Sequence, residues 1–202
     1  MLNYSWREYG YRVGAWRCLE MFDQLGLPAA AVINTALYDH APALDEAAER
    51  ELLPWISEST HTPDLLAETG YTCTLNWCHD DQVLPMHTRA GKPLWSVPYP
   101  QELNDIPMII ARQLDAKDFA QMIIDQLDEM LQQSQDSAAP ALVMGIALHP
   151  YIVGQPYRLR HLRRAVQAVA AARDEARVWL STPGAICRHV QVQWGSPPFS
   201  CA

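Results

Sequence analysis

The chain has 202 residues, of which 49% are hydrophobic and 19% are charged, and this composition is typical of a globular protein with one sizeable core. Its formal net charge of -8 argues against nucleic acid or an anionic membrane as a partner, because both require clustered lysine and arginine. Since no apolar stretch approaches the roughly 20 residues of a membrane span and no leader-like pattern opens the chain, we expect a cytoplasmic protein. Five cysteines without C-x-x-C spacing predict reduced thiols.

Stretches with helical apolar periodicity alternate with short apolar runs, which is typical of a sheet whose strands are connected by helices. The predicted helices cover residues 11–26, 41 into the fifties, a short stretch from about Thr62, 115–134, 158–173 and 183–190. The predicted strands are neighbours in one sheet and cover residues 27–34, 71–77, 94–99, 141–149 and 178–182. We therefore expect an α/β fold with largely parallel strands and with the helices packed outside the sheet.

Three residues indicate where helices begin or end. Gly26 follows the first apolar stripe and predicts a glycine stop, and Pro63 suits the first turn of the short helix. Asp115 is expected to cap the clearest amphipathic helix. The buried face of that helix is predicted to carry Phe119, Met122, Ile123, Leu127, Met130 and Leu131.

Polar side chains follow three of the predicted strands, which run into CHDDQ, PQELND and HPYIVGQP. Ligands of α/β sheets bind outside the carboxyl ends of the strands. We therefore expect Asp80, Asp81, Glu102, Asn104 and His149 to face one cavity.

The residue types in this set suit proton transfer and polar binding. Asp80 and Asp81 could hold the N–H groups of a substrate or a metal ion, and an imidazole such as that of His149 transfers protons near neutral pH. Pro150 biases His149 toward an extended backbone, which would hold the ring at the rim of the strand. The same residues also fit a structural interpretation, in which the aspartates form a polar turn, His149 is a hydrogen-bonded buried histidine and PQELND caps a helix.

Five segments carry long motifs in a fixed order: SWREYGYRVGAWRCLEMFDQLGLPAAAVINTALYDH, WISESTHTPDLLAETGY, LNWCHDDQ, VPYPQELNDIP and LHPYIVGQPYRLRHL. Together they resemble the polysaccharide deacetylase (NodB homology) superfamily, in the branch that includes cofactor-independent, PuuE-type allantoinases. The resemblance spans about residues 3–190. It implies a distorted (β/α) barrel that hydrolyses a C–N bond, either the amide of an N-acetylated sugar or a cyclic amide such as allantoin.

The resemblance also implies roles for individual residues. His149 would act as the general acid or would stabilise the tetrahedral intermediate, and Asp81 is the second catalytic candidate. Trp55 could stack on a substrate ring or belong to the core. No metal ion and no other cofactor is expected, and the expected partner is a small-molecule or sugar substrate. The candidate substrate-binding residues are Trp55, Glu58, Trp77, Asp80, Tyr99, Glu102 and Asn104.

Two motifs of the resembled superfamily are absent from this sequence. They are an aspartate motif that would precede SWREYG and a histidine-pair motif that would follow the helix near Ala41. We therefore expect an incomplete barrel, with a single domain over residues 1–190 and a mobile tail over 191–202. Exposed sheet edges of such a barrel could pair with a second copy of the chain to form a homo-oligomer. Two functions follow: a C–N hydrolase that works with the remaining residues, or a non-catalytic remnant that keeps a ligand pocket or an oligomer interface.

Overall fold

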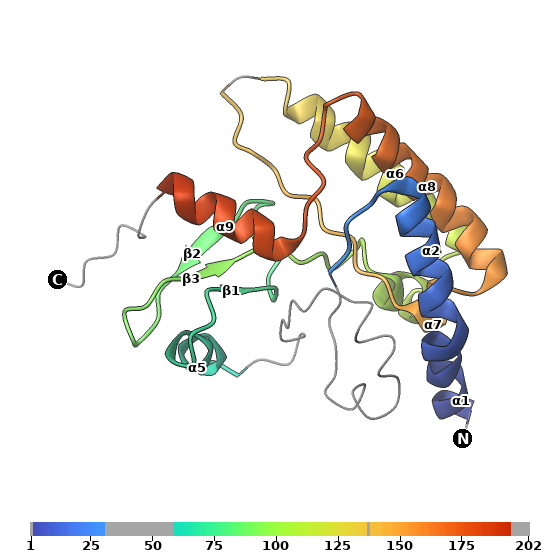
Figure 1. Ribbon diagram of the computed structural model, residues 1–202, viewed down its shortest axis with the longest axis horizontal. Coiled ribbons are helices and arrows are strands. Elements are labelled where there is room, and N and C mark those ends of the chain that lie inside the picture. Colours follow the sequence, from blue (N-terminus) through green and yellow to red (C-terminus); the bar gives the residue numbers. More distant parts are fainter. Residues whose placement is uncertain (1, 31–58, 137, 195–202) are drawn as a thin grey trace.

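The computed structural model describes residues 2–30, 59–136 and 138–194 (Figure 1). In this view most of the described helices lie on one side of the molecule, and a small sheet lies on the other side. The predicted helix from residue 41 and most of the predicted strand 27–34 lie outside the described residues, and residues 27–30 form no strand. None of the described helices is long and apolar enough to cross a membrane.

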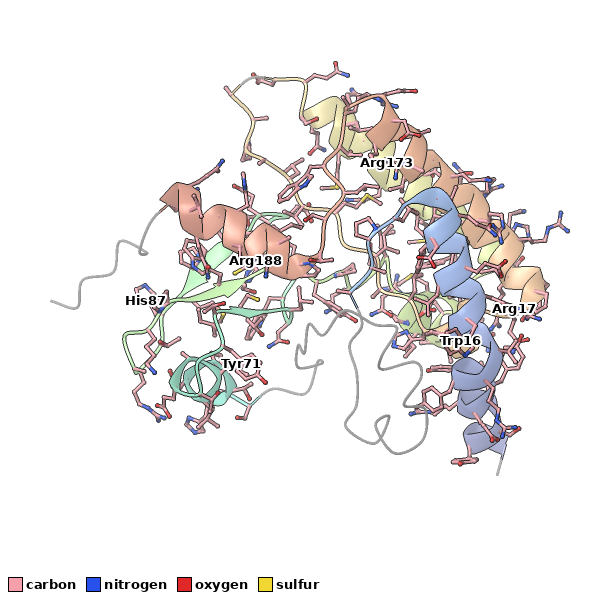
Figure 2. All side chains as sticks on the ribbon, viewed as in Figure 1. Trp16, Arg17, Tyr71, His87, Arg173 and Arg188 are labelled. Atoms are coloured by element: carbon pink, nitrogen blue, oxygen red, sulfur yellow. The ribbon has the colours of Figure 1, made fainter. Side chains whose placement is uncertain are left out.

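The N-terminal residues form one helical stretch with a π-helical turn in its middle. Its parts are α1 (Leu2–Tyr9), the π-helix η1 (Gly10–Gly14) and α2 (Ala15–Leu25). The helix therefore begins earlier than predicted. Gly26 ends it with φ of 60°, a left-handed conformation that glycine adopts easily, and this confirms the predicted stop. Arg173, labelled in Figure 2, donates hydrogen bonds to the carbonyls of Leu25 and Gly26 at 2.9 and 2.7 Å and secures this end.

Two long helices, α6 (Ala116–Gln133) and α8 (Pro156–Asp174), pack against each other and confirm two predicted helices (Figure 1). Asp115 precedes α6 in an extended conformation, but its side chain makes no capping hydrogen bond, so the expected side-chain cap is wrong. The predicted buried face is confirmed for Phe119, Ile123, Leu127 and Met130, whereas Met122 and Leu131 are half-buried. These helices and α2 enclose the larger apolar cluster, to which Met21, Phe119, Ile123, Ile152 and Leu162 belong.

The sheet has three short strands in the order β1-β3-β2: β1 (Cys73–Thr74), β2 (Leu84–Met86) and β3 (Leu94–Ser96). β1 pairs with β3 in parallel, and β2 pairs with β3 antiparallel. The sheet of the described residues is therefore mixed, and the prediction of one largely parallel sheet of five strands is wrong for them. The sequence did not indicate β2, which contains Pro85. Proline is tolerated there because β2 lies at an edge of this sheet.

Two predicted strands are absent from the described sheet. Residues 141–149 form only an isolated parallel bridge, between Ala147 and Asn104. The pairing cannot continue because the chain after Asn104 enters the π-helix η2 (Ile106–Ala111). Residues 178–182 form no strand, and Trp179 is 60% exposed, so this run is not the buried strand that its apolar residues suggested.

Three further helices complete the described structure: α5 (Thr62–Glu68), α7 (Pro150–Val153) and α9 (Pro183–Trp194). α5 has Pro63 in its first turn, as predicted. Ile186 and Val190 of α9 pack against the apolar cluster of the sheet, which contains Trp95. Because α9 continues to Trp194, residues 191–194 of the expected tail are helical, and residues 195–202 lie outside the described residues. The mobility of the tail stays a prediction.

Glycines allow α7 to lie directly against η1. A Cβ on Gly14 would overlap the carbonyl oxygen of Pro150, and a Cβ on Gly154 would overlap the Cα of Gly14. Arg17, labelled in Figure 2, and Tyr9 both donate hydrogen bonds to the carbonyl of Gly154, at 3.2 and 3.3 Å. The turn that follows His149 is therefore fixed to the N-terminal helix.

Replacing Gly14 with alanine should destabilise the protein by about 1–3 kcal/mol, because the added methyl group meets backbone atoms that cannot rotate away. Urea unfolding of wild type and Gly14→Ala measures this change. Glu20→Ala, an exposed change on α2, is the matched control and should stay within about 0.5 kcal/mol of wild type. Equal stability of Gly14→Ala and wild type would contradict the close contact between η1 and α7.

Candidate active site

Asp105 and His149 form the central pair of the candidate site. Asp105 stands immediately before η2, and His149 stands immediately before α7. Backbone hydrogen bonds align the two segments: the Ala147 N–H donates to the Leu103 carbonyl at 2.9 Å, and the Asp105 N–H donates to the Ala147 carbonyl at 3.3 Å. The isolated bridge thus brings two chain segments together at the point where each turns into a helix.

The carboxylate of Asp105 contacts His149 through both of its oxygens. Oδ2 accepts the backbone N–H of His149 at 2.7 Å, and Oδ1 lies 2.6 Å from the ring atom Nδ1. Asp105 is fully buried, whereas the His149 side chain is 22% exposed. The backbone of His149 is extended, with φ of −115° and ψ of 115°, as the following Pro150 predicted. Because Nδ1 is turned to the carboxylate, Nε2 is the nitrogen suited to exchange a proton with a substrate.

Burial governs the protonation of the groups around this pair. Loss of hydration raises the pKa of Asp105, and the hydrogen bonds and the charge of His149 oppose this rise. The thiol of Cys18 on α2 is also buried, and burial together with the nearby charge of Asp105 raises its pKa to about 11. Cys18 is therefore a neutral thiol at physiological pH and does not supply a thiolate nucleophile.

Asp80 and Asp81 lie in an exposed turn between β1 and β2. The carboxylate of Asp80 accepts a hydrogen bond from the side chain of Gln82 at 3.2 Å, and Asp81 has a left-handed backbone with φ of 61°. The Asp81 carbonyl accepts the N–H of Val143 at 2.8 Å. Asp81 therefore lies beside the start of the segment that ends at His149. That Asp80 and Asp81 face the same cavity as His149 stays a prediction.

Two other predicted binding residues, Asn104 and Glu102, differ in burial. Asn104 is buried, and its side-chain oxygen accepts the backbone N–H of Ile106 at 3.2 Å, so it helps to begin η2 beside Asp105. Glu102 is exposed and forms an ion pair with Arg112 at 3.5 Å. Asn104 is therefore next to the central pair, whereas the described contact of Glu102 is with Arg112.

The aromatic candidates lie partly in the core and partly outside the described chain. Tyr99 is 9% exposed and belongs to the apolar cluster of the sheet. Its backbone N–H donates to the carbonyl of the half-buried Trp77 at 2.8 Å. Trp55 and Glu58 lie outside the described residues. Substrate binding by these four residues stays a prediction.

Solved structures share this architecture. A protein of Pseudomonas aeruginosa PAO1 assigned as a polysaccharide deacetylase matches 97% of the chain and 77% of its own, with a TM-score of 0.81 and 21% identity. PuuE allantoinase matches 97% of the chain and 77% of its own, with a TM-score of 0.75 and 22% identity. A Mycobacterium smegmatis protein that is also assigned as a polysaccharide deacetylase matches 98% of this chain over 84% of its own length, with a TM-score of 0.79 and 19% identity. The chain has the polysaccharide deacetylase fold. No family model and no curated protein matches its sequence.

The predicted resemblance is confirmed at the level of the fold. The reaction that the site could catalyse must be inferred from its side chains. Metal-assisted hydrolysis needs about three protein ligands and an open coordination position. Within residues 2–30, 59–136 and 138–194, no three His, Cys, Asp or Glu side chains are grouped so that they could hold a metal ion. This part of the polysaccharide deacetylase fold therefore does not by itself supply a ligand set.

The sequence interpretation missed Asp105 as a site residue. It took PQELND as a pocket segment or a helix cap and gave its aspartate no role of its own. Asp105 and His149 are 44 positions apart, so no local pattern connects them. The sequence did offer one signal: Asp105 directly precedes the apolar run IPMII. A carboxylate next to such a run is expected to be buried, and a buried carboxylate needs a hydrogen-bonding partner.

The raised pKa of Asp105 predicts how its replacement by asparagine changes stability with pH. The folded state keeps the Asp105 proton to a higher pH than the unfolded state, so the stability of wild type relative to Asp105→Asn should fall as pH rises above about 4. The slope should not exceed about 1.4 kcal/mol per pH unit, because one proton is linked. Urea unfolding of both proteins between pH 4 and neutral measures it, and a difference that grows in favour of wild type with rising pH would refute the prediction.

Proposed function

We propose that the chain hydrolyses a non-peptide C–N bond of a small molecule or sugar, in carbohydrate or ureide metabolism. The candidate substrates are an N-acetylated sugar and a cyclic amide such as allantoin. The proposal depends mainly on the contact between buried Asp105 and the partly exposed His149. In this contact the carboxylate orients the imidazole, which can then act as a proton donor. The fold of the solved deacetylases and of PuuE allantoinase supports it. The proposal includes a distorted (β/α) barrel around the described sheet and a cytoplasmic location.

In this mechanism, His149 moves the proton on which departure of the nitrogen depends. Nε2 of His149 takes a proton from water as the water oxygen bonds to the carbonyl carbon, and the C–N bond of the tetrahedral intermediate then breaks. An amine leaves poorly until it is protonated, so protonated His149 donates from Nε2 to the departing nitrogen. The buried carboxylate of Asp105 accepts the Nδ1–H throughout and stabilises the imidazolium form before the transfer. Asp81 and Asp80, after β1, would hold N–H groups of the substrate.

Replacing His149 with alanine should lower the rate about 100- to 10,000-fold, because the positioned proton donor is lost. The assay measures hydrolysis of N-acetylated sugars and of allantoin by wild type and by His149→Ala. His61→Ala, an exposed histidine before α5, is the matched control and should keep the wild-type rate.

Two outcomes would contradict parts of this account. Equal hydrolysis by wild type and His149→Ala would remove His149 from the mechanism. Absence of hydrolysis in well-folded wild type would favour the alternative, a non-catalytic remnant that keeps a ligand pocket or an oligomer interface.

A further inference from the structure

The first half of α8 carries a basic stripe that no carboxylate of the described residues neutralises. The helix begins PYRLRHLRR and has no aspartate or glutamate before Asp174. Arg163 donates to the side-chain oxygen of Gln24 at 3.3 Å, and Arg164 donates to the carbonyl of Lys117 at 3.2 Å, so both bind neutral groups. In a chain with a formal net charge of -8, this stripe is a local concentration of positive charge. The basic stripe consists of Arg158, Arg160, Arg163 and Arg164.

The neighbouring face of α2 offers the complementary chemistry. A hollow of about 340 Å³ on this face is lined by Trp16, Leu19, Glu20, Asp23 and Gln24. Trp16, labelled in Figure 2, is 44% exposed. The carboxylate of Glu20 accepts a hydrogen bond from Gln24 at 3.3 Å, whereas the exposed carboxylate of Asp23 has no partner in the described chain. An exposed indole close to an available carboxylate suits an arginine, because a guanidinium stacks on aromatic faces and pairs with carboxylates.

The basic stripe and the hollow lie side by side and at the same level of the molecule. Helices α2 and α8 are in contact (Figure 1). Arg17 binds the carbonyl of Gly154 just before α8, and Gln24 near the end of α2 binds Arg163 within α8, so the two helices run in the same direction. A twofold axis along their boundary would therefore place the stripe of one copy over the hollow of another, and the reverse.

We propose that this α2–α8 surface is the interface of a homodimer. Arg160 of one copy enters the hollow of the second copy between Trp16 and Asp23, and the symmetric contact forms at the same time. Arg160 is exposed and makes no contact with a described residue, so its guanidinium is available. The proposal does not depend on hydrolysis by the chain, and it places the interface on helices instead of on the edges of the sheet.

The first test measures association by sedimentation equilibrium. Wild type should have the mass of two chains at micromolar concentrations. Arg160→Glu and Asp23→Lys should each weaken the dimer at least about 100-fold, because each substitution brings like charges together at both symmetric contacts. Arg177→Glu, the same change at an exposed arginine beyond α8, is the matched control and should leave the dimer intact. A monomeric wild type would overturn the proposal, and so would a dimer that resists both reversals, as association through sheet edges would.

The second test distinguishes a lost contact from a damaged fold, because it restores the contact without restoring either residue. When the Arg160→Glu and Asp23→Lys chains are mixed, one contact joins the two altered residues with opposite charges, and the other contact is the original pair. The equimolar mixture should therefore form a heterodimer with an affinity within about 10-fold of that of wild type. Circular dichroism confirms that each variant keeps its helices. A mixture of folded variants that stays monomeric would overturn the proposal.

Discussion

The candidate site depends on one short backbone contact, the bridge between Asn104 and Ala147. The contact is too short to make a strand, yet it aligns two segments just before each enters a helix. Asp105 then lies where its two oxygens meet the backbone and the ring of His149. The buried carboxylate costs hydration energy, and the hydrogen bonds from His149 offset part of that cost. The bridge therefore places the two residues together, and their hydrogen bonds reduce the cost of burying the carboxylate.

The N-terminal helix keeps this arrangement in place from one side. Its glycines allow α7 to approach η1, and Arg17 and Tyr9 bind the carbonyl of Gly154 at the end of α7. The π-helical turn lies at this contact, and π-turns inside helices often occur near functional sites. The turn that carries His149 is thus fixed by the close packing of glycines and not by a long series of β-sheet hydrogen bonds.

The sequence predicted the helices better than the sheet. Helices α6 and α8 have long apolar stripes with a local period, and their positions were predicted correctly. The run at 141–149 has the composition of a buried strand, but whether it pairs depends on a segment about 40 positions away that turns into η2. The extended backbone of His149 was predicted correctly because Pro150 acts locally. Asp105 was missed because its role exists only when its distant partner is in place.

The most direct test of the account is the distance between Nδ1 of His149 and Oδ1 of Asp105 in a crystal structure of the protein at neutral pH. We expect a hydrogen bond near 2.6 Å, with the other carboxylate oxygen accepting the backbone N–H of His149. A separation beyond about 3.5 Å, with the His149 ring turned away from the carboxylate, would contradict it.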